Sequence, residues 1–210
     1  KNFILTNSLP HSSSFQLRIK RIADIFISLF ILIFSSPLII LICILIFFED
    51  GKPIFYSQIR NGLGNSKIKI LKLRTMKVSA EELGPQWSKT NDSRIRKIGR
   101  IIRKLRLDEL PQLLLVISGQ MSLIGPRPER PEIDIVLNNN IKNYSIRYKF
   151  KPGLSGWAQV NYPYGASIKD SKNKLGYDLY YLKNFSIFLD FLIFIKTISL
   201  VFNAKGAIAQ

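Results

Sequence analysis

The stretch IFISLFILIFSSPLIILICILIFF, residues 25–48, decides the fold because it is 24 residues long and almost wholly apolar. At about 1.5 Å per residue, a helix of this length exceeds the roughly 30 Å hydrocarbon core of a bilayer. The run is broken only by Ser28, Ser35, Ser36 and Pro37. On length alone, the stretch predicts a helix that spans a membrane.

Two features of the same stretch favour a different path. Pro37 falls in the middle, where it removes a helical hydrogen bond and kinks the backbone, and neighbouring Ser hydroxyls can satisfy the freed carbonyls. Basic residues flank both ends, so the positive-inside rule keeps both ends in the cytoplasm. Residues 15–50 are therefore predicted to form a re-entrant membrane hairpin broken at Ser36 and Pro37. A kinked spanning helix fits nearly as well and stays open.

The composition of the 210-residue chain joins a high apolar content to a large positive charge. Hydrophobic residues make up 47%, and 31 Lys and Arg stand against 14 Asp and Glu, a net charge of +17. A nucleic-acid-binding protein would share the charge but seldom the apolar content. Both are expected of a protein that lies against anionic lipid and handles phosphorylated ligands. Since Cys43 and His11 are the single cysteine and histidine, we expect no disulfide and no Ser/His or Cys/His catalysis.

The length predicts one domain with one core. Residues 1–14 read as a poorly ordered leader, residues 15–50 as the membrane element, and residues 51–210 as the domain that carries the chemistry. No signal-peptide cleavage pattern precedes the domain, and the chain does not begin with Met. We therefore expect it to be a processed or excised portion of a longer protein.

A β-hairpin is predicted after the membrane element. The alternating sequences IFYSQIR, residues 54–60, and KIKILKLRTM, residues 67–76, flank the turn sequence NGLGN. The turn glycines could also suggest a phosphate-binding loop, but they connect two strands and no helix follows. A hairpin is therefore favoured. Residues 79–92 are polar and predict a loop or short helix.

Two consecutive helices are expected next. SRIRKIGRIIRKLRL, residues 93–107, places isoleucines at helical spacing among cationic side chains. This pattern predicts a basic amphipathic helix with Asp92 or Ser93 as its N-cap. The second helix should follow Pro111 and end near Gly119.

A last helix is predicted after Ser186. Its sixteen residues, IFLDFLIFIKTISLVF, include an Asp and a Lys and are too few to span a membrane comfortably. They suit a helix that lies in the membrane interface, with core packing as an equal rival. The predicted fold class is α+β, mainly helical: a membrane-embedded re-entrant helix hairpin plus a small cytosolic domain with a β-hairpin and interfacial amphipathic helices.

The stretch RKLRLDELPQLLL, residues 103–115, places Asp108 and Glu109 side by side at the end of a basic run. One interpretation is structural, because carboxylates in the first turn of a helix complement its dipole. The other is chemical, because adjacent carboxylates repel each other unless a cation neutralises them, and Mg²⁺ prefers hard oxygen ligands together with substrate phosphates. The residues themselves leave both open.

In a magnesium and diphosphate site, a carboxylate can also attack phosphorus, because the metal and nearby cations neutralise the diphosphate. Two arginines are candidates to neutralise the diphosphate, one because it is close to Asp108 in sequence and one because prolines stiffen its backbone. Arg103 precedes Asp108 by five residues, and Arg127 lies between two prolines in GPRP. A guanidinium on a stiffened backbone loses less entropy when it grips a phosphate.

These residues and several further motifs resemble the bacterial sugar transferase family, the monotopic polyprenyl-phosphate phosphoglycosyl transferases. The resemblance runs from about Phe15 to Ala207, and its specificity lies in seven motifs that occur in order. They are KRIADIFISLFILIFSSPLII, GKPIFYSQIRNGLG, ILKLRTM, RKLRLDELPQL, MSLIGPRPE, KPGLSGWAQVN and YDLYYLKNFSIFLDFLIFIKT.

The resemblance implies a membrane enzyme of the bacterial inner membrane with its catalytic domain on the cytoplasmic face. Members enter one leaflet through a helix broken at a Ser-Pro pair, which Ser36 and Pro37 match. They transfer a sugar 1-phosphate from a nucleotide diphosphate sugar, usually a UDP-sugar, to a polyprenyl phosphate such as undecaprenyl phosphate. Nucleic acid is not an expected partner, and a homo-oligomer is left open.

By the same resemblance, Asp108 is the nucleophile of a covalent phosphosugar-enzyme intermediate, and Mg²⁺ binds at Asp108 and Glu109. The residues expected to contact phosphate or other parts of the substrate are Arg74, Arg103, Arg127 and Gln159.

The chain also departs from the family pattern. Where the family usually has an Asn and then KGDMS, this chain has Leu115 and SGQMS, so Ser118 and Gln120 replace a cation and an acid. The YPYGAS sequence after Asn161 differs too, so the resemblance does not extend to the sugar. Two rival functions stay open: a membrane-tethered nucleic-acid or anionic-lipid binding module, and a scaffold without turnover.

Overall fold

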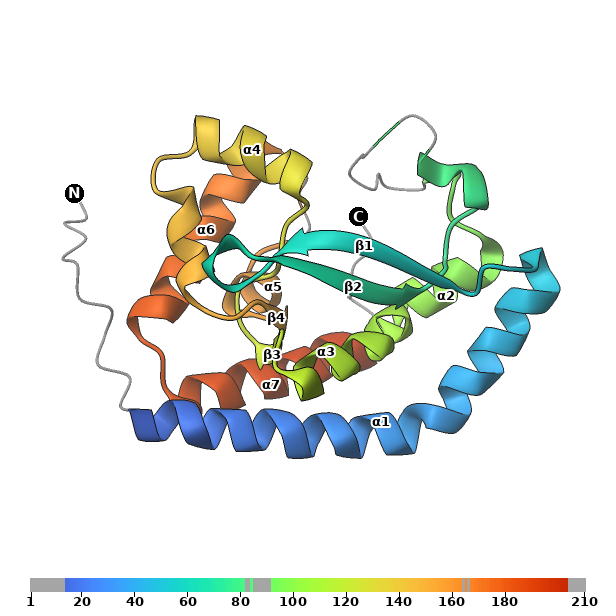
Figure 1. Ribbon diagram of the computed structural model, residues 1–210, viewed down its shortest axis with the longest axis horizontal. Coiled ribbons are helices and arrows are strands. Elements are labelled where there is room, and N and C mark those ends of the chain that lie inside the picture. Colours follow the sequence, from blue (N-terminus) through green and yellow to red (C-terminus); the bar gives the residue numbers. More distant parts are fainter. Residues whose placement is uncertain (1–13, 82–83, 85–91, 164, 166, 204–210) are drawn as a thin grey trace.

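The computed structural model describes residues 14–81, 84, 92–163, 165 and 167–203 (Figure 1). The predicted leader lies outside this part except for Ser14. Within it the fold is mainly helical with two short pairs of strands, which confirms the α+β class. The α-helices are α1 (Ser14–Asp50), α2 (Lys97–Lys104), α3 (Leu113–Ser118), α4 (Pro131–Asn140), α5 (Trp157–Asn161), α6 (Ile168–Lys183) and α7 (Ile187–Phe202). The strands are β1 (Phe55–Asn61), β2 (Lys67–Leu73), β3 (Ser122–Ile124) and β4 (Gly153–Ser155), and the 3₁₀ helices are η1 (Leu63–Asn65), η2 (Val78–Glu81), η3 (Leu107–Gln112) and η4 (Tyr144–Lys149).

The predicted break at Ser36 and Pro37 lies inside one continuous helix, α1, which Figure 1 shows bent along its length. Because Pro37 has no N–H, the carbonyl of Ile33, four residues earlier, loses its usual helical partner. The hydroxyl of Ser36 donates to this carbonyl at 2.7 Å. The Ser-Pro pair therefore lets the helix bend without leaving a bare carbonyl in apolar surroundings.

Both ends of α1 are held by the same domain. Near its start, the Arg21 guanidinium donates to the carbonyls of Val116 and Ile117 in α3, at 2.5 and 2.7 Å. At its last residue, the Asp50 carboxylate pairs with Arg74 at 3.4 Å and with Arg96 at 3.2 Å. Without the bend, the second half of the helix would leave the domain. This arrangement is compatible with a re-entrant path, whose place in a membrane stays a prediction.

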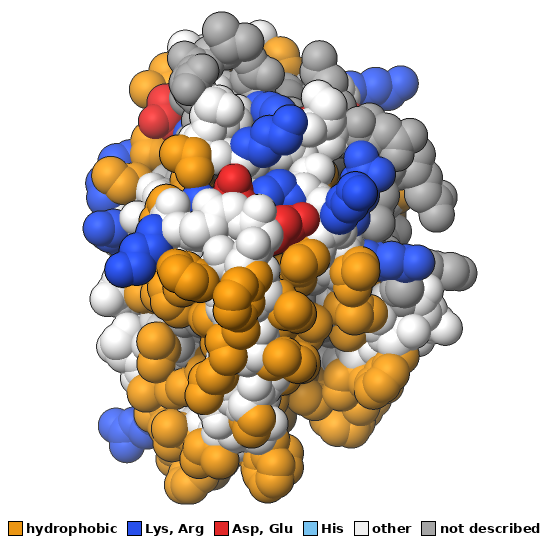
Figure 2. All heavy atoms as spheres, turned by 90° about the vertical axis from the view of Figure 1, so that its right-hand side faces the viewer, with side chains coloured by type: hydrophobic (Ala, Val, Ile, Leu, Met, Phe, Trp, Pro, Cys, Tyr) orange, Lys and Arg blue, Asp and Glu red, His pale blue; other side chains and the backbone are white. Residues whose placement is uncertain are grey.

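A broad apolar surface covers one side of the molecule, and we call it the apolar base. It is formed mainly by α1 and α7, which run along the bottom in Figure 1. In Figure 2 most side chains of the lower half are apolar, and most of the charged ones lie above them. In the described part, α1 is the one helix long and apolar enough to cross a membrane, and only 11% of its most apolar window is buried. Large exposed side chains of the apolar base include Phe26, Phe30, Phe34, Leu41, Phe48, Phe188, Phe191, Ile195 and Phe202.

The final helix, α7, serves two environments at once. It begins after Ser186 as predicted, and the Ser186 hydroxyl accepts a hydrogen bond from the Leu189 N–H at 3.1 Å. Leu189 and Ile193 face the main core, whereas Phe188 and Phe191 are exposed on the apolar base. One face of α7 therefore packs in the core. The opposite face is exposed, and its contact with a membrane interface stays a prediction.

The predicted β-hairpin is confirmed. β1 and β2 pair antiparallel from Phe55 opposite Leu73 to Asn61 opposite Lys67, with η1 at the turn. Ile68 and Ile70 of β2 point into the main core. Since side chains alternate along a strand, Lys72 falls on this same inner side, where β2 packs against η3.

β3 and β4 form a short parallel pair that brings two distant segments of the chain together. Ser122 lies opposite Gly153 and Ile124 opposite Ser155. A Cβ atom on Gly153 would meet the backbone nitrogen of Gly125 at 2.1 Å, so the close approach of the two segments requires glycine. β3 leads directly into the GPRP loop and β4 into α5, which brings two sequence motifs to one place.

The basic amphipathic helix is shorter than predicted. α2 begins at Lys97, with Arg96 and not Asp92 or Ser93 at the N-cap position, because the Asp92 carboxylate instead bonds the backbone and guanidinium of Arg94. The following helix ends as predicted, at Gly119 with a φ of 88°. Most of residues 79–92 lie outside the described part.

Candidate active site

The acid pair lies in η3, directly after α2. Arg106 adopts the left-handed conformation with a φ of 54°, which turns the chain between α2 and η3. Asp108 and Glu109 then occupy the first turn of η3, as the dipole interpretation expects. Only 8% of Asp108 and 6% of Glu109 is exposed, so neither carboxylate is a solvated helix cap.

The Glu109 carboxylate is enclosed by cations from three elements. Lys72 of β2 donates to its Oε1 at 2.7 Å, and Arg127 donates to Oε1 at 2.5 Å and to Oε2 at 3.4 Å. Arg106 lies 3.8 Å from Oε2. Burial by itself would raise the pKa of Glu109, but Arg127 and Lys72 outweigh it and hold the pKa well below its ordinary value. Glu109 is therefore ionised and firmly held.

The neighbouring Asp108 carboxylate lacks the cationic partners that hold Glu109. Among the described residues, its carboxylate has no hydrogen-bond or ion-pair partner. Burial raises its pKa, Lys72 opposes the rise, and the adjacent Glu109 charge adds to it. A buried carboxylate is usually satisfied by donors. An open, more basic carboxylate beside a fixed one suits a nucleophile or a ligand for an incoming cation.

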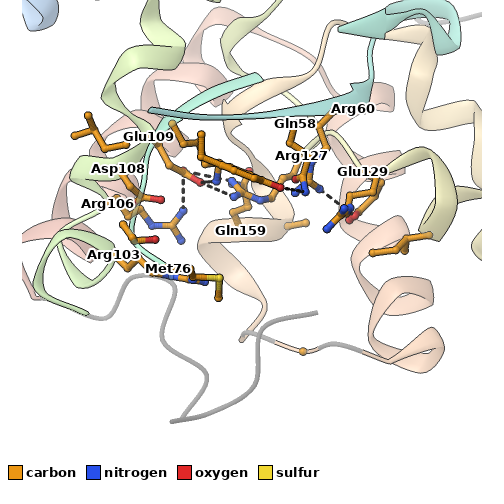
Figure 3. A pocket seen from close by; sticks show the side chains of 18 of the residues that line it. Gln58, Arg60, Met76, Arg103, Arg106, Asp108, Glu109, Arg127, Glu129 and Gln159 are labelled. Atoms are coloured by element: carbon orange, nitrogen blue, oxygen red, sulfur yellow. Dashed lines mark hydrogen bonds and ion pairs between the residues drawn. The ribbon is translucent and has the colours of Figure 1, made fainter. Parts of the chain in front are cut away.

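Both acids line a large cavity of about 1080 Å³. In the described part, twelve Lys and Arg residues line it against four Asp and Glu. Figure 3 shows Asp108, Arg103 and Arg106 towards one side of the cavity and Arg60 and Glu129 towards the other. Such an excess of cations around a concave site suits a ligand with several negative charges, such as a diphosphate.

All four predicted substrate contacts line this cavity, Arg74 included. Arg103, Arg127 and Gln159 all line the cavity with the acid pair. The amide of Gln159 donates to the carbonyl of Leu154 at 3.1 Å, and its Oε1 is buried without a partner among the described residues. A ligand N–H or O–H would satisfy this oxygen.

Arg74 also borders the cavity, but its guanidinium serves another purpose. It donates to the carbonyls of Asp50 and Gly51 at 3.1 and 2.8 Å, at the end of α1. These bonds anchor the helix end through one nitrogen, Nη2, while Nε and Nη1 have no hydrogen-bond partner among the described residues. Its role at the substrate stays a prediction.

Two residues around the acid pair were missed from the sequence. Lys72 carried a signal, because it is a cation at an inner-face position of an alternating strand. Arg106 lies three residues before Glu109, a spacing at which helical side chains meet. Basic residues are so frequent in this chain that neither signal stood out.

The fit of the acid pair to a metal ion can be judged from its free oxygens. Across the described residues, no group of three or more His, Cys, Asp or Glu side chains is placed to hold a metal. Mg²⁺ in phosphate sites is held by one or two carboxylates together with water and substrate oxygens, and the open Asp108 carboxylate fits this pattern. The Glu109 oxygens are occupied by Lys72 and Arg127.

Comparison with known proteins gives the family. A profile described as bacterial sugar transferase matches residues 15–204. The chain is 42% identical over 189 residues to the UDP-N-acetylgalactosamine-undecaprenyl-phosphate N-acetylgalactosaminephosphotransferase of Aeromonas hydrophila. It is 35% identical over 190 residues to the UDP-glucose:undecaprenyl-phosphate glucose-1-phosphate transferase of Klebsiella pneumoniae, and 35% identical over 188 residues to the uncharacterized sugar transferase EpsL of Bacillus subtilis.

The three matches differ in how much of each relative they include. Each covers 90% of this chain. The chain spans 45% of the Aeromonas protein and 41% of the Klebsiella protein, but 89% of the Bacillus protein. The matched region contains the acid pair, the GPRP loop and the apolar helix. The chain therefore belongs to the bacterial sugar transferase family.

Proposed function

We propose that this chain transfers a sugar 1-phosphate from a UDP-sugar to undecaprenyl phosphate through a covalent intermediate on Asp108. The names of the two longer relatives support the class of donor and acceptor. The observation that carries the proposal is the contrast within the acid pair: an unpartnered Asp108 next to a Glu109 held by three cations, inside a cavity lined by positive charge.

The proposed chemistry has two steps. In the first, a carboxylate oxygen of Asp108 attacks the phosphorus that bears the sugar, the bond to the bridging oxygen breaks, and UMP leaves with that oxygen. In the second, a phosphate oxygen of undecaprenyl phosphate attacks the same phosphorus and displaces the Asp108 carboxylate. The product is an undecaprenyl diphosphate sugar, and the carboxylate is restored.

The remaining residues of the site would prepare the diphosphate for attack. Arg103 and Arg127 can spread the charge that develops on the phosphoryl oxygens, and Glu109 fixes the Arg127 guanidinium. A bound Mg²⁺ would supply further neutralisation of the diphosphate and would be held by Asp108 with substrate oxygens. Gln159 is free to accept a hydrogen bond from the donor through its Oε1.

The position of the apolar base next to the cavity supports a site at a membrane surface. A lipid-borne phosphate and a water-soluble nucleotide sugar must both reach Asp108. α7 contributes exposed Phe202 to the apolar base, while its neighbours Leu200 and Asn203 line the cavity. We therefore propose that the apolar base rests in the cytoplasmic leaflet of the bacterial inner membrane, with the cavity at the level of the lipid head groups.

Mass spectrometry of the purified protein tests the covalent step. Incubation with Mg²⁺ and either UDP-N-acetylgalactosamine or UDP-glucose should add one sugar phosphate to the peptide that contains Asp108. Undecaprenyl phosphate should discharge the adduct, and Asp108→Asn should not form it. An adduct in Asp108→Asn, or turnover by the parent protein with no adduct when the acceptor is withheld, would overturn the mechanism.

Compartment-specific labelling in cells tests the membrane path of α1. One tag placed ahead of residue 1 and the substitution Lys52→Cys, introduced into Cys43→Ser, should both be shielded from an impermeant reagent on the periplasmic side. If only one end were labelled, α1 would span the membrane and the re-entrant path would be wrong.

A further inference from the structure

The loop that carries Arg127 is held in an unusual way. Four consecutive carbonyls, from Pro126 to Glu129, each accept a hydrogen bond from another part of the chain. The pairs are Gly153 N–H to Pro126 at 2.9 Å, Arg147 guanidinium to Arg127 at 2.7 Å, Arg60 guanidinium to Pro128 at 3.3 Å and Asn61 N–H to Glu129 at 2.9 Å. The donors come from β4, η4 and β1, so three separate elements fix a segment that contains two prolines.

The donor to the Arg127 carbonyl is itself a buried charge. Only 5% of Arg147 is exposed, and its guanidinium lies 2.8 Å from the Asp178 carboxylate of α6. It also donates to the hydroxyl of Tyr144 and lies over that ring, 5.1 Å from its centre. Burying an arginine is unfavourable unless it is paired, so these partners account for its presence in the core.

Arg147 and Asp178 line the same cavity as the acid pair and are linked to it through Arg127. Arg147 contacts the backbone of Arg127, and the side chain of Arg127 grips Glu109, next to Asp108. The fixed carbonyl and the two flanking prolines leave the Arg127 backbone little freedom to rotate. The direction of its guanidinium is then decided by a contact with η4 and α6, far along the sequence.

We propose that Arg147 and Asp178 are positioning residues that aim Arg127 at Glu109 and at the donor diphosphate. The inference rests on the proposed function and deepens it, because neither residue is required to touch the reacting atoms. A shift of about 1 Å in a group that orients a substrate lowers the rate by up to about a hundredfold.

Steady-state kinetics with whichever of UDP-N-acetylgalactosamine and UDP-glucose the parent protein uses provide the test. Arg147→Lys keeps the charge but loses the planar guanidinium, whose Nη2 reaches the Arg127 carbonyl and Asp178 while Nη1 reaches Tyr144. Asp178→Asn keeps the shape but removes the charge. Each variant should lower kcat/KM for the donor by about tenfold to a hundredfold.

A matched control separates positioning from general stability. Asp190→Asn breaks another buried ion pair, with Lys20 at 2.6 Å, between α1 and α7. Asp190 does not line the cavity. This variant should lower the melting temperature while kcat/KM for the donor stays within about threefold of the parent value. If Arg147→Lys and Asp178→Asn behave in the same way as Asp190→Asn, the positioning role is wrong.

A double-mutant cycle measures whether Arg147 acts through Arg127, which a purely structural role of Arg147 would not require. If Arg147 acts through Arg127, Arg147→Lys should have little further effect in an Arg127→Lys background, whereas Asp190→Asn should add its own effect. Additive losses for Arg127 and Arg147 would overturn the inference. Failure of the proposed function has a different signature, because the parent protein would then turn over neither UDP-sugar.

Discussion

Two buried aspartates of this protein have opposite surroundings. Asp134 of α4 accepts hydrogen bonds from Asn61 at 2.8 Å, from Asn138 at 2.9 Å and from the hydroxyl of Tyr148. Asp108 is nearly as buried, yet its carboxylate has no partner among the described residues. Since burying a carboxylate without donors is unfavourable, the chain itself satisfies the Asp134 carboxylate, whereas the Asp108 carboxylate is open to an added donor or cation.

The largest test of this contrast is to neutralise each aspartate in turn. Asp108→Asn should abolish donor turnover, a loss of at least about 10³-fold, because the amide is no substitute for a nucleophilic carboxylate. Asp134→Asn should leave kcat/KM for the donor within about threefold in the protein that folds. Radiolabelled sugar transfer to undecaprenyl phosphate would measure both. Comparable activity in the two variants would remove the distinction.

The cations around Glu109 give the next largest effect. Lys72→Met should lower kcat/KM for the donor by about tenfold to a hundredfold, because Glu109 loses a charged donor at 2.7 Å and the cavity loses a positive charge. Lys69→Met is the matched control, since Lys69 lies on the same strand but is exposed. Equal losses in the two variants would mean that only the overall charge of the hairpin matters.

The same two variants should affect the free energy of unfolding in the opposite order, with the larger loss in Asp134→Asn. Asp134→Asn leaves a buried cluster of donors short of acceptors and should lower the free energy of unfolding by about 1–3 kcal/mol. Asp108→Asn should be neutral or slightly stabilising, because it removes an unpartnered buried charge. Thermal melting in detergent measures both. A drop in melting temperature for Asp108→Asn as large as that for Asp134→Asn would show that Asp108 has a structural partner after all.

The last prediction concerns the pH dependence of stability and Asp178. Burial raises the pKa of Asp178 to about 6 against the opposing charge of Arg147, while Glu129 raises it further and Lys174 lowers it. Because the folded state then holds a proton that the unfolded chain releases, this group makes the free energy of unfolding fall as the pH rises from about 4 to about 6. Asp178→Asn should remove that slope. Melting curves of the parent and the variant that run parallel across this range would contradict it.

Much of the local structure could be predicted because it depends on neighbours in sequence. The alternation around NGLGN gave the hairpin, Gly119 gave the end of α3, and Ser186 gave the start of α7. The N-cap of α2 was missed for a local reason too, since Asp92 can bond either a helix N-terminus or Arg94 and the sequence favours neither.

Contacts between distant segments were harder to predict. The sequence did not predict that one guanidinium nitrogen of Arg74 bonds the end of α1, and the role of Arg74 at the substrate stays a prediction. Lys72 was not singled out, because its partner Glu109 lies 37 residues away. A strand pattern shows which face a side chain takes but not which element covers that face.

The sequence by itself determined that an acid pair would lie at the start of a helix beside basic residues, and that Ser36 and Pro37 would interrupt the hydrogen bonding of the apolar stretch. Both follow from the chemistry of adjacent residues and of proline. Only the tertiary structure decided which carboxylate is fixed and which is open. That choice depends on Lys72 of β2 and Arg127 of the GPRP loop, which donate hydrogen bonds to Glu109 and none to Asp108.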